Sequence, residues 1–145
     1  MMEVIQMQPQ NQSFDKISMT YLELRASLPA LQKLFSQEFS SMKFLIKLKK
    51  LLDECDRELK YFEDVRYQLI QRYGEESTDE NGNPIWKVKE ENTNTFMQEI
   101  DKTLQETVTL NAEPLFYDEL VKYSENTDLK LTAMDIKALE KFIKY

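Results

Sequence analysis

The strongest pattern of apolar positions in the chain lies between Met42 and Tyr73. Apolar side chains recur there at alternating steps of three and four, and neither glycine nor proline interrupts them. This spacing is typical of one face of a long α-helix and also of a coiled-coil seam. The seam positions are Leu45, Leu48, Leu52, Cys55, Leu59, Phe62, Arg66, Leu69 and Tyr73. We expect one helix over 42–73, ending at Gly74, whose stripe pairs within the chain or between chains.

Shorter helices are predicted on both sides of the long one. An apolar stripe over 17–35 contains Pro29. Proline suits only the first turn of a helix, so either a short helix begins near residue 27 or a longer one is kinked there. We favour a short helix over about 27–36. A further helix should start at Asn92 or Thr93 and pack antiparallel on the long helix. Its predicted apolar face is Phe96, Met97, Ile100 and Leu104.

The last third of the chain predicts an extended crossing followed by short helices. Val108, Leu110 and Pro114 mark the crossing, and 117–123 reads as a helical turn. Thr132 and Asp135 have the spacing of a capping box, which predicts the start of a final helix. The expected buried face of that helix is Ile136, Leu139, Phe142 and Ile143.

Between the two main helices, residues 75–91 predict an acidic loop or a small two-stranded flap. Asn81 and Gly82 form a strong turn signal, and residues 85–88 alternate apolar and charged side chains like a short strand. The fold class is therefore mainly α, a small helical bundle around the 42–73 helix with a loop or β-hairpin flap over about 75–91. We expect one helical domain over 17–145, preceded by a flexible arm over 1–16 that is rich in Gln, Asn, Ser and Met.

Composition excludes several classes of chemistry. The chain has 145 residues and no histidine, which removes Ser-His-Asp triads, Cys-His pairs and histidine metal sites. Two glycines allow neither a phosphate-binding loop nor a dinucleotide-binding motif. The lone Cys55 and the lack of a signal-peptide pattern favour a cytoplasmic, non-secreted protein. We expect no enzymatic activity and no cofactor, and a carboxylate-based metal hydrolase is the enzymatic alternative.

Negative charge is concentrated in the middle of the chain. Residues 75–128 hold 14 acidic and 4 basic residues, a net charge of −10, within a chain whose formal net charge is −7. Such a surface repels nucleic acid, so we expect no direct binding to DNA or RNA.

Two local motifs have functional alternatives. Asp79, Asn81, Asn83 and Glu90 stand at the first, third, fifth and twelfth places of a calcium loop, but Pro84 replaces the glycine that the loop requires at its sixth place. We favour a solvated turn without metal. Residues 42–52 form a basic amphipathic stretch that could lie on a membrane or fill a partner's groove. Burial within the chain explains its apolar positions better, so no membrane contact is expected.

Two side chains are candidates for contact with a partner protein. Arg66 lies in the apolar seam and needs either a carboxylate, such as Glu99 or Asp101 on the facing helix, or a wet partner surface. Trp86 either attaches the flap to the bundle, which we favour, or anchors a partner. With the acidic flap, the candidate interaction residues are Trp86, Arg66, Glu75, Glu76, Asp79 and Glu80.

The order of residues over 17–34, 59–74 and 79–82 resembles a family of small uncharacterised proteins of tailed bacteriophages (siphophages). Members have a short apolar helix, then a long charged helix that ends like residues 62–74 of this chain, an acidic turn and a proline-containing crossing. The resemblance covers about 17–145, with Pro29 and the arm outside it. Since the family has no assigned activity, it implies a phage origin and no site residues.

These observations together predict an interaction protein. The first hypothesis is a non-enzymatic phage accessory protein, and its sharper version is an acidic inhibitor that occupies the basic groove of a host nuclease or defence complex. The alternative is a structural subunit or chaperone of phage head or tail assembly. In either case the partner would be a host or phage protein, and a homo-oligomer is possible.

Overall fold

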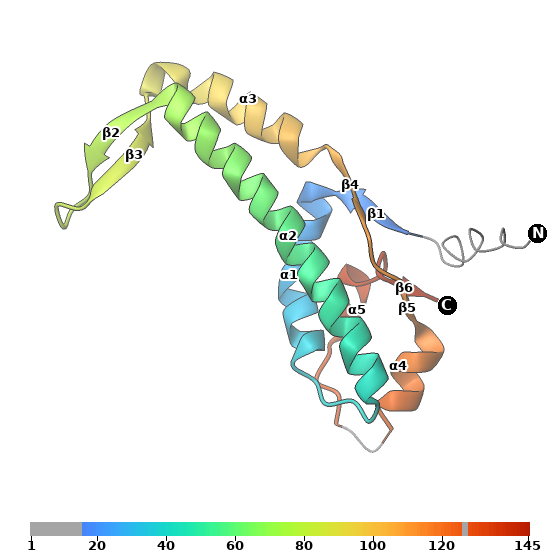
Figure 1. The fold of residues 1–145 in the computed structure, drawn as a ribbon. Coiled ribbons are helices and arrows are strands. Elements are labelled where there is room, and N and C mark those ends of the chain that lie inside the picture. The colour runs from blue at the N-terminus through green and yellow to red at the C-terminus, as the bar shows by residue number, and fades with distance from the viewer. Residues whose placement is uncertain (1–15, 126–127) are drawn as a thin grey trace, which may run out of the picture.

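The long helix α2 (Met42–Tyr73) forms the axis of the fold, as Figure 1 shows. The computed structural model describes residues 16–125 and 128–145, and the predicted arm lies outside them apart from Lys16. At its start the Ser41 hydroxyl accepts a hydrogen bond from the Phe44 N–H at 3.1 Å, which satisfies one of the free donors of the first turn. At its end Gly74 is extended rather than helical. The predicted bounds of this helix are confirmed.

The first helix, α1 (Tyr21–Phe35), is longer than predicted, and the favoured start near residue 27 is wrong. Thr20 and Glu23 form a capping box, in which the Glu23 N–H donates to the Thr20 hydroxyl at 3.1 Å and the Thr20 N–H donates to the Glu23 carboxylate at 2.9 Å. Pro29 lies inside the helix with its ring exposed. The capping box and the burial of the apolar face therefore outweigh the one backbone hydrogen bond that the proline cannot make. The buried apolar residues of α1 are Tyr21, Leu24, Ala30, Leu31 and Leu34.

The predicted flap is a β-hairpin, and the chain then returns along α2. Strands β2 (Gly74–Thr78) and β3 (Pro84–Val88) pair antiparallel. A short 3-10 turn, η2 (Glu90–Asn92), leads into α3 (Thr93–Leu104), which runs antiparallel to the end of α2 as predicted (Figure 1). The predicted face of α3 is only partly correct, because Ile100 is buried but Met97 is 49% exposed.

Two further small sheets close the fold. Strand β1 (Ile17–Thr20) pairs antiparallel with β4 (Thr107–Leu110), so that Ile17 faces Leu110. Beyond the crossing, β5 (Leu115–Phe116) precedes α4 (Tyr117–Tyr123), the predicted helical turn. Strand β6 (Ile143–Lys144) pairs parallel with β5.

The C-terminal segment differs from the prediction in where its helix ends. The capping box of Thr132 and Asp135 is confirmed, and it starts α5 (Ala133–Ala138). The predicted helical face is wrong in two ways. Ile136, within α5, is 39% exposed, and the buried residues Phe142 and Ile143 follow the helix instead of belonging to it. The chain turns after α5 because this places the Phe142 ring in the core and leaves its carbonyl to accept from the Leu115 N–H at 2.8 Å.

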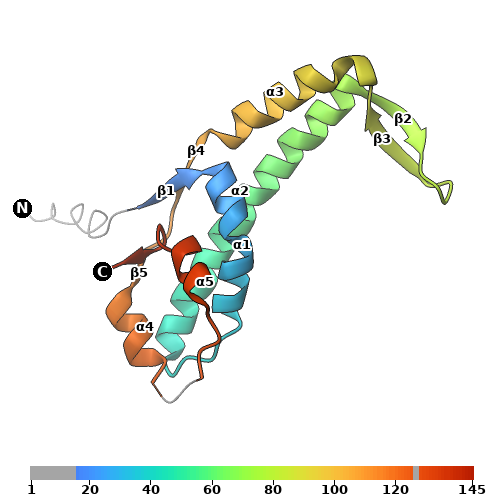
Figure 2. The same cartoon turned by 180° about the vertical axis from the view of Figure 1, so that it is seen from behind.

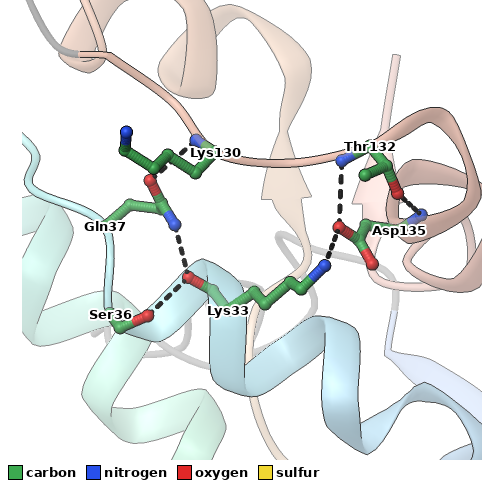
Figure 3. Close-up of polar contacts among 6 residues, drawn as sticks. All are labelled: Lys33, Ser36, Gln37, Lys130, Thr132 and Asp135. Atoms are coloured by element: carbon green, nitrogen blue, oxygen red, sulfur yellow. Dashed lines mark hydrogen bonds and ion pairs between the residues drawn. The ribbon is translucent and has the colours of Figure 1, made fainter.

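Polar contacts hold this segment against the end of α1 (Figure 3). The Lys33 ammonium pairs with the Asp135 carboxylate at 2.9 Å. The Gln37 side-chain oxygen accepts a hydrogen bond from the Lys130 N–H at 3.0 Å. Through the capping box, the same Asp135 carboxylate accepts from the Thr132 N–H, so one side chain both starts α5 and attaches it to α1.

The core joins elements from both ends of the described chain. It is built around the buried side of α2, with the inward residues of α1, β1 and β4 and the C-terminal segment. Its fully buried large side chains are Phe44, Phe62, Phe142, Leu24, Leu31, Leu34, Leu51, Leu110, Leu115, Leu139 and Cys55. Burial raises the pKa of the Cys55 thiol to about 12, so it is uncharged at neutral pH. The predicted mainly α fold class is confirmed.

Candidate protein-interaction surfaces

The hairpin arm, residues 74–88, projects from the C-terminal end of α2 away from the core (Figures 1 and 2). At its base the Tyr73 carbonyl accepts hydrogen bonds from the Lys89 N–H at 3.0 Å and from the Asn92 side-chain amide at 3.1 Å. Gly74 joins the strand directly to the helix. The arm is therefore held at its base by backbone contacts of α2 and extends beyond them.

The tip of the hairpin arm is ordered by Asp79. One oxygen of its carboxylate accepts from the N–H groups of Asn81 and Asn83, both at 2.9 Å, and Gly82 adopts a φ of +80°. The hydrogen bond from the Asn83 N–H is the main reason that the pKa of Asp79 lies below its usual value of 3.8, and the bond from the Asn81 N–H also lowers it. The carboxylate thus serves the turn itself, which agrees with the predicted solvated turn.

The structure gives no support to a calcium loop at this place. Glu90, the twelfth position of that pattern, lies in η2 outside the turn. Over 16–125 and 128–145 there is no group of three or more carboxylate or cysteine side chains placed to hold a metal ion.

The acidic candidates lie along the arm with their charges available. Glu75, Glu76 and Glu80 are exposed, and their side chains make no hydrogen bond or ion pair within the described residues. Glu75 stands opposite Lys87 and Glu76 opposite Trp86 in the strand register. With Asp79 in the turn, the structure therefore brings five of the six candidate residues together on one projecting element.

Trp86 belongs to the same arm. Paired residues share a face in an antiparallel hairpin, so Trp86 and Val88 share a face with Glu76. The ring is half-buried, but it is neither a core residue nor one of the partly buried apolar residues packed against the core. Strand β3 itself contacts α2. That Trp86 attaches the flap to the bundle therefore stays a prediction.

Arg66 is placed differently from the prediction. Its guanidinium pairs with the Glu63 carboxylate one turn earlier on α2, at 2.9 Å, and its side chain is 44% exposed. The predicted partners Glu99 and Asp101 on α3 are wrong, because the residue faces solvent rather than the facing helix. A second surface pair on α2 joins Glu54 to Arg57 at 2.9 Å.

A second surface, at the opposite end of α2, was not predicted. A cavity of about 590 Å³ opens between the first turns of α2, the crossing after β4, and α4. We call it the basic cavity, because Lys43, Lys47 and Lys50 of α2 line it. Its apolar wall includes the rings of Phe44, Phe116 and Tyr123. The predicted burial of the apolar residues in this stretch is confirmed for Phe44, Leu48 and Leu51.

The three lysines are not equivalent. Lys47 pairs with the Glu119 carboxylate at 2.6 Å and lies 4.5 Å from the centre of the Phe116 ring, with 13% of its side chain exposed. Lys43 and Lys50 are exposed and make no ion pair or hydrogen bond through their side chains within the described residues. Among the residues that the structure describes, the cavity is therefore lined by one neutralised cation, Lys47, and by two cations without a side-chain partner.

One sequence signal does correspond to this cavity. Steps of four and three place Lys43, Lys47 and Lys50 on one helical face. That spacing cannot show what lies opposite, because Asn111 and Glu119 reach the cavity only through the tertiary fold.

Comparison with known proteins adds no relative to this description. The chain matches no protein-family model, and none of the curated proteins or solved structures compared with it is similar. Within the described residues, every helix is too short or too polar to cross a membrane. The fold and its two surfaces thus define a mainly α protein with a projecting acidic hairpin at one end and a basic cavity at the other.

Proposed function

We propose that this is a non-enzymatic protein that acts by contact with another protein, and that the hairpin arm is its principal binding surface. The observation that carries the proposal is the position of the arm, which extends from the end of α2 beyond the core (Figure 1). Within the described residues, β2 and β3 pair only with each other. Each strand therefore keeps one edge of N–H and C=O groups with which a partner strand could pair.

The side chains of the arm favour a basic partner. Three unpaired carboxylates, those of Glu75, Glu76 and Glu80, give electrostatic attraction, and the half-buried Trp86 ring offers an apolar anchor of the type enriched at interfaces. Support for a non-enzymatic role comes from the composition, since a chain without histidine and with two glycines lacks the usual groups of acid–base and phosphate chemistry.

The resemblance of residues 17–145 to the tailed-phage family supports a phage accessory protein that acts in the host cytoplasm. On this proposal the acidic arm is an inhibitor that occupies the basic groove of a host nuclease or defence complex. A structural or chaperone role in head or tail assembly is the second candidate function. The basic cavity favours it, because a chain with complementary surfaces at its two ends suits repeated contact between subunits.

The test is affinity capture from infected-host lysate with tagged protein and charge variants. The arm variant is Glu75→Lys, Glu76→Lys and Glu80→Lys. Asp79 is left unchanged, because its carboxylate orders the turn. The matched body variant is Glu38→Lys, Asp101→Lys and Glu140→Lys, three exposed acidic residues outside the arm whose side chains form no ion pair within the described residues. Both variants change the net charge by the same amount.

We expect the arm variant to lose a basic partner that the wild-type protein and the body variant both retain. Addition of salt should release that partner, because screening weakens attraction between exposed charges. Equal capture by the arm and body variants would refute a binding role for the arm. Recovery of a nuclease or defence protein supports the inhibitor role, whereas recovery of phage structural proteins supports assembly.

A further inference from the structure

We propose that the basic cavity receives the tip of the hairpin arm of a second copy of this chain, so that copies associate head to tail. The inference rests on the proposed function, because it uses the same arm, and it names one partner for it. It follows from the chemistry of the two surfaces and from their positions at opposite ends of α2.

The basic cavity has attractive groups for an acidic, partly apolar segment. Lys43 and Lys50 carry charges without partners in the described part of the chain, and Ile46, which is 48% exposed, lies on the cavity wall between them. Lys47 is held in place by Glu119 and by the Phe116 ring, and so it shapes the wall rather than offering a free charge. A bound segment would therefore meet two cations around an apolar floor.

The tip of the hairpin arm carries the complementary groups. Glu80 is exposed in the turn, and Glu76 is exposed on β2. Ile85, close to the turn on β3, is 38% exposed and so offers an apolar side chain near the tip. Hydrogen bonds to Asp79 already fix the backbone of the tip, so docking would order few additional residues and lose little conformational entropy.

One molecule cannot satisfy both surfaces by itself. Both views place the hairpin arm beyond the C-terminal end of α2 and α4 beside its N-terminal end (Figures 1 and 2). A straight helix of 32 residues is about 48 Å long, so the arm cannot reach the cavity of its own chain. Two different surfaces that meet between copies form a heterologous contact, which produces a ring if it closes and an open chain if it does not.

Charge in the cavity limits the strength of this contact. Glu113 and Glu119 also line it and oppose an incoming carboxylate. The association should therefore be reversible, concentration-dependent and sensitive to salt. The Debye length falls from about 30 Å at 0.01 M salt to about 3 Å at 1 M, which would remove most of the attraction.

The experiment is sedimentation velocity on the full chain over a range of concentrations, at low salt and at about 1 M salt. The arm variant is the one used above, and the cavity variant is Lys43→Glu with Lys50→Glu. A matched cavity control is Lys102→Glu with Lys137→Glu, two exposed lysines elsewhere on the surface. Circular dichroism confirms that each variant is folded.

We expect the wild-type protein and the cavity control to self-associate at low salt. The arm and cavity variants should each associate about tenfold more weakly or not at all. Mixed together, these two variants should associate, because the cavity variant still has an intact arm and the arm variant still has an intact cavity. The altered arm is basic and the altered cavity is acidic, so these two surfaces also attract each other, and the mixture should associate where neither variant does alone.

Three results would overturn the inference: a wild-type protein that stays monomeric at every concentration, a cavity variant that associates like the wild type, or a mixture that does not associate. Affinity capture and sedimentation together distinguish a failure of this inference from a failure of the proposed function. If the arm variant loses a different partner in affinity capture while the wild-type protein is monomeric, the arm binds that partner and the self-association fails alone. If the arm variant changes neither readout, both proposals fail.

Discussion

Gly74 links α2 to the hairpin arm at a position with no room for a side chain. A Cβ atom there would lie 2.7 Å from the Lys87 carbonyl oxygen and closer still to the Ile70 carbonyl oxygen. Both neighbours are backbone atoms, so relief requires the helix end and the strand to separate. We expect Gly74→Ala to lower the free energy of unfolding by about 1–3 kcal/mol, measured by urea denaturation.

Gly82 is the natural control for this prediction. It has a φ of +80°, which Asn also adopts, and open space around its Cβ position. Gly82→Asn should therefore change stability much less than Gly74→Ala. Equal stability of Gly74→Ala and the wild-type protein would contradict the proposed tight junction.

Glu54 connects α2 to the crossing after β4. Its carboxylate accepts from the Arg57 guanidinium at 2.9 Å and from the Asn111 N–H at 2.8 Å. The hydrogen bond from Arg57 is the main reason that the pKa of Glu54 lies below its usual value of 4.5, and the Asn111 N–H lowers it further. Partial burial acts in the opposite direction. The unfolded chain therefore takes up this proton at a higher pH than the folded chain.

The sign of the pH dependence follows from that shift. The stabilisation by ionised Glu54 is complete above the unfolded pKa near 4.5, and it is lost as the pH falls through the lower folded pKa. We expect Glu54→Gln to cost about 1 kcal/mol at pH 7 and less at pH 3, below the unfolded pKa, as measured by urea denaturation at both pH values. Asp53→Asn, which removes an exposed partner of Lys49, should be nearly neutral at both. If Glu54→Gln lowered the free energy of unfolding equally at both pH values, the ionised carboxylate of Glu54 would not be the source of the stabilisation.

At the scale of elements, α1 retains a proline in its interior. Pro29 has no N–H to donate to the Arg25 carbonyl four residues earlier, and its ring is exposed, so it contributes no buried surface. The helix persists because its ends and its buried face specify it. We expect Pro29→Ala to raise the free energy of unfolding, by up to about 3 kcal/mol, in thermal and urea denaturation.

Gln32, an exposed residue on the same helix, gives the control for that substitution. Gln32→Ala should leave stability within about 0.5 kcal/mol. Destabilisation by Pro29→Ala would show that the ring has a packing role which its exposure does not reveal.

At the scale of the whole molecule, the C-terminal residues complete the core. Phe142 is fully buried, and β6 pairs with β5, so the chain end covers elements that precede it by about 30 residues. We expect Phe142→Ala to cost about 3–5 kcal/mol, measured as a lower urea midpoint by circular dichroism. Tyr145→Ala, at an aromatic ring that is 79% exposed, should have little effect. Similar stability of the two variants would place Phe142 outside the cooperative core.

Local signals predicted some parts of this molecule well. The bounds of α2 were predicted because the periodic apolar positions, which neither glycine nor proline interrupts, and the stop at Gly74 are local signals. The hairpin followed from Asn81 and Gly82 in the same way. The spacing of Thr20 and Glu23 is also a local start signal for α1. The predicted start near residue 27 was wrong because it relied on Pro29 instead of on this capping box.

Other features depended on the environment that distant segments create. Arg66 occupies a seam position, but its side chain is 44% exposed and pairs with Glu63 on α2. Phe142 continues the period of a helix, but the turn after α5 places it in the core from non-helical backbone. Periodicity in sequence shows which residues are apolar, and it does not show where the chain must turn to bury them.

The sequence by itself determined the long helix, the hairpin, the mainly α class and the acidity of the arm, because propensity, capping and turn chemistry act between near neighbours. Only the tertiary structure decided that the acidic arm projects from one end of α2 while a basic cavity forms at the other. That cavity joins Lys43 to Asn111 and Glu119, more than 60 residues later in the chain. Such a site exists only after burial of the core has brought these segments together.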